Sequence, residues 1–329
     1  MRERLPGFQA NPCARGTWRA GPDLKQRRPE PIALVSMPAL AQVKSEETPP
    51  RAQVLAALRA RLLEGGLELP LLPQIASEVM ALAGNPSAEA ARLSALIHRD
   101  PALAGKVLRM ANSAASAARM PVVSLQQAVA RLGMVSVSEL AFAASVQGGV
   151  FTVRGHEALL RGLWRHALAS ASYAREIARG RRNNVEGAYL CGLLHTVGKP
   201  LVLRFAVKCA EERALALSPA DLGGLLEELH VPFGMVLGES WKLPRTALAA
   251  IAFHQEPARA PAFRTEAVVT ALASALGTHA LASAVRGGPE EDALRALPHA
   301  AELNLYPEDL DALFAAAEKV RAAVDSLTV

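Results

Sequence analysis

Apolar side chains recur every three or four positions along most of the chain after residue 50, which is the spacing of amphipathic helices. In the segment 51–64, Val54, Leu58 and Leu62 share one helical face, and Gly65 follows as a stop signal. No segment alternates convincingly with a period of two, and the chain shows neither a strand–helix–strand rhythm nor a repeat of fixed length. The pattern therefore predicts an all-α protein.

Capping signals mark the helix starts of the first half. Asp100 places a carboxylate directly before Pro101, and proline suits the first position of a helix, so a helix is expected from residue 101. Two further pairs have the spacing of a capping box: Ser124 with Gln127, and Ser136 with Glu139. Gly133 lies between these pairs and is expected to end the first of the two helices. Earlier helices are expected at roughly 51–64, 73–83 and 87–98.

The second half continues in the same way, with helices expected at roughly 156–179, 187–195, 199–216, 221–230, 232–241, 244–255, 264–285 and 307–326. Pro232, Pro244 and Pro307 each stand where a helix could begin. The last segment carries apolar side chains on or near one face: Leu310, Leu313, Phe314, Val320 and Val324. It is expected to pack back on the fold or, alternatively, to bind a partner helix.

The first 50 residues differ from the rest. They contain eight prolines and no sustained period, which predicts a mostly disordered Pro/Arg-rich tail. Two alternatives stay open. The segment Ile32–Ala41 has the composition of a signal-peptide core, although it starts late and is interrupted by Pro38. Alternatively, Met37 is the natural start, in which case residues 1–36 do not belong to the natural protein.

Composition narrows the class of protein. Hydrophobic residues make up 51% of the 329 residues, enough for a sizeable core, whereas the aromatic share of 4% is low for β-sandwiches and barrels. No stretch approaches the roughly 18 uninterrupted apolar residues of a membrane span. Cys13, Cys191 and Cys209 show no CxxC spacing and predict free thiols in a reducing compartment. We therefore expect a cytoplasmic protein that does not bind a membrane.

The formal net charge of +5 is carried mainly by the tail. Residues 1–36 hold seven basic and three acidic side chains and so account for +4, which leaves +1 for the remainder. A bulk electrostatic argument for nucleic-acid binding by the folded part therefore fails. Binding through the arginines of the tail stays a separate hypothesis, which removal of residues 1–36 would test by its effect on salt-dependent affinity.

Few motifs in the sequence indicate chemistry. Gly198 and Lys199 resemble part of a phosphate loop, but the spacing is wrong and Pro200 stands where the magnesium-binding hydroxyl belongs. Neither a GxSxG nor an HExxH motif is present. Four histidines fall within or beside expected helices, and a bundle can bring such side chains to one site: His166, His195, His230 and His254. Scattered histidines without a neighbouring carboxylate are more often simply hydrogen-bonded or exposed.

The helical segments also contain short blocks in a fixed order across roughly residues 62–276: Leu69–Ile75, Ile97–Leu103, Val107–Ser113, Ser124–Val129, Arg131–Gly133, Leu163–His166, Gly192–Gly198, Trp241–Pro244 and Phe253–Pro257. Together these blocks resemble the HDOD domain, an output-type relative of the HD phosphohydrolases in bacterial signalling proteins. The resemblance implies a multi-helix HD-like bundle with a smaller N-terminal helical lobe. It also implies a structural role for nine block residues: Asp100, Pro101, Asn112, Ser113, Gly133, Trp164, Gly198, Trp241 and Pro244.

Catalytic HD proteins hold a divalent metal through a histidine, a His-Asp pair and a later aspartate. By resemblance, His166 and His195 match the two histidines, but Thr196 and Ser274 stand where the aspartates belong. The resemblance therefore implies a remnant pocket without metal, cofactor or catalytic residue: His166, His195, Thr196, His230, His254 and Ser274. Two or three neutral imidazoles could still bind zinc or nickel.

The expected organisation is a tail (1–50), an N-terminal lobe (51–150), an HD-like lobe (151–285) and a C-terminal helical extension (286–329), with the lobes sharing one core. The resemblance implies a non-enzymatic regulatory or scaffolding protein that binds other signalling proteins. The alternative is a degenerate metal-dependent phosphohydrolase acting on a nucleotide or phosphoester. The chain shows no receiver, sensor or cyclic-di-GMP module, so we expect its input to arrive in trans or through a ligand. The sequence names neither the partner nor the oligomeric state.

Two surfaces are candidates for partner binding. One is the mouth of the remnant pocket near His166, His195 and His254, and the other is the junction between the lobes. We favour the junction, because the Asn112-Ser113 and Leu163-Trp164 blocks are expected to approach it from both sides. The alternative is that both blocks serve only core packing.

Overall fold

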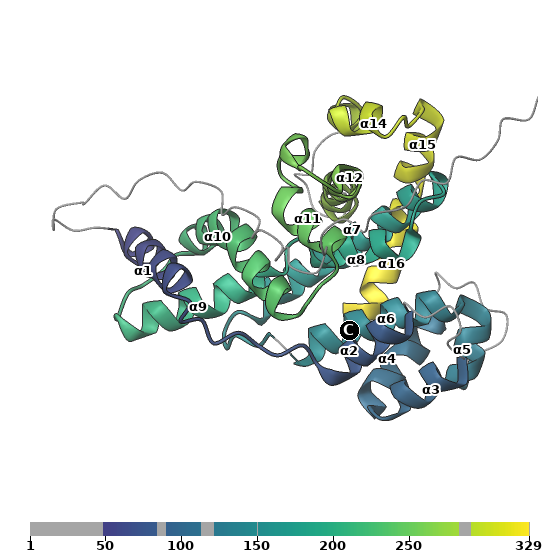
Figure 1. The fold of residues 1–329 in the computed structure, drawn as a ribbon, viewed down its shortest axis with the longest axis horizontal. Helices are drawn as coiled ribbons and strands as arrows, with labels where there is room; N and C mark the ends of the chain where they lie inside the picture. The colour runs from purple at the N-terminus through teal and green to yellow at the C-terminus, as the bar shows by residue number, and fades with distance from the viewer. Residues whose placement is uncertain (1–48, 84–89, 113–121, 150, 283–290, 329) are drawn as a thin grey trace, which may run out of the picture. The chain divides into compact units, whose positions relative to one another are not determined.

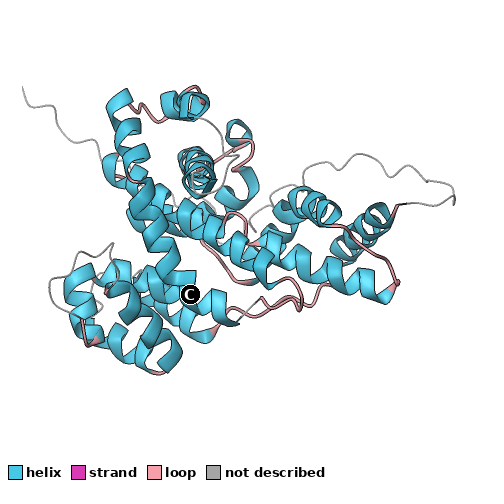
Figure 2. Cartoon of the chain, turned by 180° about the vertical axis from the view of Figure 1, so that it is seen from behind, coloured by secondary structure: helices cyan, strands magenta, loops and turns pink. Residues whose placement is uncertain are grey.

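The computed structural model describes residues 49–83, 90–112, 122–149, 151–282 and 291–328. Every regular element within these ranges is a helix, which confirms the predicted all-α class (Figure 2). Residues Thr48 to Val329 form one compact unit. The predicted tail, apart from its last two residues, lies outside the described residues, as do Cys13 and Ser113.

The described helices are α1 (Pro50–Glu64), α2 (Gln74–Ala83), α3 (Ala90–His98), α4 (Pro101–Ala111), α5 (Leu125–Leu132), α6 (Met134–Gly149), α7 (Glu157–Gly180), α8 (Val185–Leu194), α9 (Gly198–Glu212), α10 (Pro219–Ser240), α11 (Arg245–Phe253), the 3₁₀ turn η3 (Pro257–Arg259), α12 (Arg264–Ala282), α13 (Glu291–Arg295), α14 (Pro298–Glu302), α15 (Pro307–Ala315) and α16 (Ala317–Thr328).

Helices α2 to α6 pack on one another and form the N-terminal lobe (Figure 1). The α5 helix begins as its sequence predicts, because Ser124 Oγ accepts a hydrogen bond from the amide of Gln127 at 3.2 Å. It ends at Gly133, whose φ of +83° is a conformation that glycine adopts without strain. The second predicted capping box does not form, because α6 already starts at Met134 and places Ser136 inside its first turn.

Helix α1 differs from its predicted place. The sequence assigned it to the N-terminal lobe, but it packs on α9 and α10 of the HD-like lobe (Figure 1). Val54 and Leu58 are fully buried, and Arg51 and Arg59 both form ion pairs with Glu228 of α10, at 2.8 and 2.6 Å. The apolar face of α1 predicted a buried helix, but periodicity alone does not say which neighbour covers that face.

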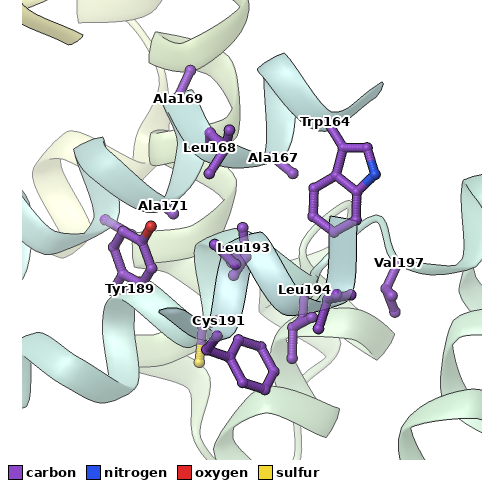
Figure 3. Close-up of a cluster of buried hydrophobic side chains, with 14 of the residues drawn as sticks. Trp164, Ala167, Leu168, Ala169, Ala171, Tyr189, Cys191, Leu193, Leu194 and Val197 are labelled. Carbon is purple, nitrogen blue, oxygen red and sulfur yellow. The ribbon is translucent and has the colours of Figure 1, made fainter. Parts of the chain in front are cut away.

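The HD-like lobe is built around α7, which packs most extensively on α8 and α12. The side chains between α7 and α8 are apolar, and Figure 3 shows Leu168, Trp164, Leu193 and Leu194 among them. Gly192 permits this close approach, because a Cβ atom there would lie 2.7 Å from the Cα of Ala171. The result is a tightly packed pair of helices at the centre of the lobe.

Two further predictions of helix boundaries are wrong. A break was expected before Pro232, but α10 runs through this residue, because Leu229, Phe233 and Leu237 are buried on both sides of it. The last segment was expected to be one helix, but it divides at Ala316 into α15 and α16. Both pack back on the fold: α16 contacts α7 and also α4 of the N-terminal lobe.

One stretch of the described chain, Val185–Glu212, is long and apolar enough by composition to cross a membrane. It corresponds to α8 and α9, and 78% of its most apolar window is buried inside the protein. The core helices of a folded domain pass the same test, so the finding is weak evidence for a span.

Candidate functional site

Four histidines that are distant in the sequence meet inside the HD-like lobe. His166 lies on α7, His195 directly follows α8, His230 lies on α10 and His254 directly follows α11. In the order 166, 195, 254, 230, the ring centroids are 5.4, 4.9 and 5.3 Å apart. We call these four side chains the histidine row.

Ser274 joins one end of the row. Its Oγ, on α12, lies 3.2 Å from Nε2 of His195 and 3.2 Å from Nε2 of His166. Because a hydroxyl carries one proton, Ser274 donates to one ring and accepts from the other. Thr196 is placed elsewhere: it is buried and lines a separate small pocket with apolar side chains of α7 and α8. The structure thus brings together every predicted pocket residue except Thr196.

Backbone carbonyls determine the tautomers of three of these rings. Nδ1 of His195 lies 2.7 Å from a carbonyl oxygen of the preceding turn. Nδ1 of His230 lies 2.9 and 3.0 Å from two such oxygens, and Nδ1 of His254 lies 3.1 Å from two more. Since a carbonyl only accepts, each Nδ1 carries a proton and donates it. Each Nε2 is therefore an acceptor that faces into the row.

The other end of the row holds two such acceptors face to face. Nε2 of His230 lies 3.2 Å from Nε2 of His254. The two atoms form a hydrogen bond only when one Nε2 carries a proton, either a second proton on that ring or the ring's own proton moved from Nδ1. Burial opposes a second proton: it lowers the pKa of His254 to about 4 and lowers the pKa of His230 from its ordinary value. At neutral pH both imidazoles are therefore uncharged.

An ion pair that the sequence reasoning missed stands beside the row. The side chain of Lys199 is 13% exposed, and its Nζ donates to Glu227 at 2.6 Å. After burial, the positive charge of Lys199 is a further cause of the lowered pKa of His166, His230 and His254. Helical spacing could have found both residues, because Lys199 follows His195 by four positions and Glu227 precedes His230 by three.

These donors do not fit the divalent metal of a catalytic HD site. The row offers four imidazoles and a hydroxyl, and the carboxylate of Glu227 is paired with Lys199. Among the described residues, no group of three or more His, Cys, Asp or Glu side chains is arranged to hold a metal ion. Magnesium and manganese prefer carboxylate oxygens, and neutral imidazoles suit zinc, nickel or copper better. We therefore derive no hydrolytic step through a metal.

Burial also limits access to the row. His195 and His230 have no exposed surface, and His254 is 8% exposed. A phosphoester has to reach the reacting atoms of an enzyme, and these three rings offer it little or no surface, whereas His166 is partly exposed. The row therefore links α7, α8, α10, α11 and α12 through contacts that are mostly buried.

The remaining block residues lie at helix ends and packing contacts. Oδ1 of Asp100 accepts from the amides of Ala102 and Leu103, at 2.9 and 3.0 Å, directly before the helix that Pro101 starts. Asn112 closes the segment between α4 and α5, because its amide group donates to the carbonyl of Val122 at 2.8 Å and accepts from its N–H at 2.6 Å. These bonds hold the helix ends of the N-terminal lobe in place.

Trp241 and Gly198 hold larger parts of the chain together. Nε1 of Trp241 donates to the carbonyl of Pro70 at 2.8 Å, which links the end of α10 to the segment before α2. Pro244 follows shortly and is the residue directly before α11. Trp164 is buried near the connection between α6 and α7. A Cβ atom at Gly198 would lie 1.9 Å from the carbonyl oxygen of His230, so only glycine fits between α9 and α10.

An all-helical bundle that keeps the histidines of an HD site and lacks its carboxylates defines a degenerate, HD-related class of protein. The comparison with protein families agrees: residues 69–257 match the HDOD domain, which is more than half of the chain. The protein belongs to the HDOD domain family, as its sequence blocks predicted.

Two solved bacterial proteins have a fold similar to that of this chain. A candidate signal transduction protein from Marinobacter aquaeolei VT8 is 26% identical, with a TM-score of 0.63 over 85% of this chain and 66% of that one. A candidate metal-dependent phosphohydrolase from Shewanella amazonensis SB2B has a TM-score of 0.62 over 84% of this chain and 99% of that one, but at 20% identity it shows the fold alone. The family and the first of these neighbours fit a signalling role.

A relative among curated proteins is an uncharacterized protein from Treponema pallidum (strain Nichols), 26% identical over 202 residues. The match covers 59% of this chain and 39% of that protein. It adds no statement about activity.

Proposed function

We propose that this protein is a non-enzymatic regulatory or scaffolding protein of bacterial signalling, which acts by binding other proteins. The observation that carries the proposal is the donor set of the histidine row. By the resemblance, Thr196 and Ser274 stand where a catalytic HD site has aspartates, and the one carboxylate beside the row, Glu227, is paired with Lys199. The fold does not need these carboxylates to form, so it can serve to bind another protein instead of a metal and a substrate.

The junction between the lobes is the partner surface that we favour. The segment between α1 and α2 crosses from the HD-like lobe to the N-terminal lobe, and the bond from Trp241 to Pro70 fixes it there. Leu71, the next residue, is 87% exposed. An apolar side chain that is both exposed and held in place is suited to anchor a partner protein. Cys191 and Cys209 are buried free thiols, which is consistent with action in the cytoplasm.

Capture of partners from the source bacterium by the full-length protein tests this proposal. We expect Leu71→Glu to abolish capture while leaving the melting temperature unchanged. Leu63→Glu is the matched control, because Leu63 is also an exposed leucine (60% exposed) but lies near the end of α1, away from the bond between Trp241 and Pro70. If His166→Gln abolished capture and Leu71→Glu did not, the junction would be the wrong surface, and a ligand at the histidine row would be the better explanation.

A further inference from the structure

A cavity of about 660 Å³ lies where three parts of the chain meet. Its walls come from α5 and α6 of the N-terminal lobe, from α7 and α8 of the HD-like lobe, and from α15 and α16 at the C-terminal end. Figure 1 shows α16 passing between α7 and the N-terminal lobe. A cavity of this volume is in the ordinary range for sites that bind small molecules.

Basic groups outnumber acidic ones in its lining. The basic side chains are Arg175, Arg179, Arg181 and Lys319, and the acidic ones are Glu176 and Asp309. Both acidic groups are already engaged: Glu176 accepts from Arg179 at 2.7 Å, and Asp309 accepts from the backbone N–H of Tyr306 at 2.9 Å as part of a helix cap. Counted within the lining alone, there are two more positive than negative charges, and one of the positive groups, Arg175, also pairs with Glu139 outside the lining.

Two of the basic side chains have N–H groups that donate no hydrogen bond within the described part of the protein. Lys319 forms no ion pair with the described residues. Arg175 makes a long hydrogen bond of 3.3 Å to Glu139, and its buried Nε has no hydrogen-bond partner, since Glu176 lies 3.8 Å away. Burial raises the pKa of Glu139 to about 7, so near neutral pH this carboxyl compensates the charge of Arg175 only in part.

The rest of the lining is apolar, with an aromatic ring. Leu140, Leu168 and Leu313 come from three different helices. Tyr189 also lines the cavity, and the guanidinium of Arg175 lies over its ring at 5.7 Å from the centroid. This contact orients the planar fork of the guanidinium, which matches the oxygens of a phosphate group. The site thus combines an apolar wall with fixed anion-binding donors.

We propose that this junction cavity binds a small phosphate monoester with a flat apolar body, and that this ligand is an input to the regulatory protein. A phosphate monoester carries nearly two negative charges at neutral pH, which matches the surplus of the lining. The apolar body would lie against the leucines. The second half of the proposal rests on the proposed function, because it assumes that a partner responds to the junction. Binding itself is measured on the purified protein alone.

Calorimetric titration of the full-length protein tests the cavity. The ligands are adenosine 5′-monophosphate and flavin mononucleotide, each compared with its parent, adenosine or riboflavin, and with inorganic phosphate. We expect at least one of the two monoesters to bind, and its parent and inorganic phosphate to bind about tenfold more weakly, because each lacks half of the contacts. Failure of both monoesters to bind at millimolar concentration would overturn the proposal.

Substitutions in the lining test whether the ligand binds in this cavity. Lys319→Gln and Arg181→Gln each remove one lining charge and should weaken binding several-fold, and together about tenfold or more. Lys208→Gln is the matched control, because Lys208 is an exposed lysine on α9, outside the lining. Ala312→Trp fills the cavity without changing its charge and should also abolish binding. Binding that none of these substitutions alters lies elsewhere and contradicts the proposal. Binding in the cavity without any effect on partner capture contradicts the second half of the proposal, the role of the ligand as an input, and leaves the proposed partner binding to its own test.

Discussion

The carboxylate of Asp100 accepts hydrogen bonds from two amides of the first turn of α4, amides that have no partner within the helix. Removing it should therefore cost about 0.5–2 kcal/mol of stability. We expect this loss in Asp100→Ala, measured as a lower midpoint of denaturant unfolding with an unchanged slope. Asp100→Asn keeps a capping oxygen and should stay close to the native value. An unchanged midpoint in Asp100→Ala would show that the cap does not stabilise the fold.

The buried histidines make stability depend on pH. In the folded protein the pKa of His254 is about 4, below its ordinary value of 6.5. Between these values the unfolded chain binds a proton that the folded protein does not, so stability is lost as pH falls from about 6.5 to about 4. The loss is on the order of 1–3 kcal/mol for one such histidine. His254→Gln removes the titrating group and should flatten this part of the stability–pH curve.

Glu139 has an opposite effect in nearly the same range. Its folded pKa of about 7 lies above the ordinary value of 4.5, so the folded protein binds the extra proton and this group adds stability as pH falls. The test is therefore the difference between native protein and His254→Gln, in which the contribution of Glu139 cancels. A difference that does not change between pH 7 and pH 4 would contradict the burial of a neutral His254.

Among the helices, the close contact between α9 and α10 depends on Gly198, which has no side chain. A Cβ atom at residue 198 would meet the backbone of α10, at 1.9 Å from the His230 oxygen and 2.6 Å from the Gly234 nitrogen. Gly198→Ala should cost about 1–3 kcal/mol or more, because backbone atoms have to move apart. Gly223→Ala is the matched control on α10, where a Cβ atom meets nothing within 4 Å, and there alanine should be neutral or stabilising. Equal melting temperatures for both variants would refute the close contact.

The positions of most helices could be predicted from the sequence, but which helices pack on one another could not. Apolar spacing and caps such as Ser124 are local properties, and they located most helices within a few residues. Pro232 misled the prediction, because burial of its neighbours outweighs the hydrogen bond that proline removes. The place of α1 on α10 depends on Glu228, which lies far along the chain from Arg51. A contact between residues so far apart produces no pattern in the sequence around either of them.

At the scale of the whole molecule, the candidate site was predictable where family blocks cover it. The resemblance pointed to His166, His195, His254 and Ser274, and the place of His230 on an expected helix added the fourth ring; the structure brings these five side chains together, but it places Thr196 elsewhere. It did not find the ion pair beside them, whose two partners belong to different helices. The junction cavity was also missed, because helices from three separate regions form its walls and no single segment carries its signature.

The cavity and the proposed partner surface are both parts of the junction between the lobes. A ligand that contacts α6, α7 and α16 together would favour one arrangement of these helices over others, since binding shifts an equilibrium by its difference in affinity for the two states. We therefore expect adenosine 5′-monophosphate or flavin mononucleotide, whichever binds, to change the yield of partner capture at least twofold. The measurement is the capture experiment repeated at saturating ligand, with Ala312→Trp, which should abolish ligand binding, as the control that should not respond.

The proposed function requires that the histidine row does not catalyse phosphoester hydrolysis. The most direct measurement is the turnover of bis(p-nitrophenyl) phosphate by purified protein supplied in turn with manganese, magnesium, iron and zinc, compared with His195→Ala prepared in the same way. We expect that no metal raises turnover in the native protein above that of His195→Ala. Metal-dependent turnover that His195→Ala abolishes would contradict it.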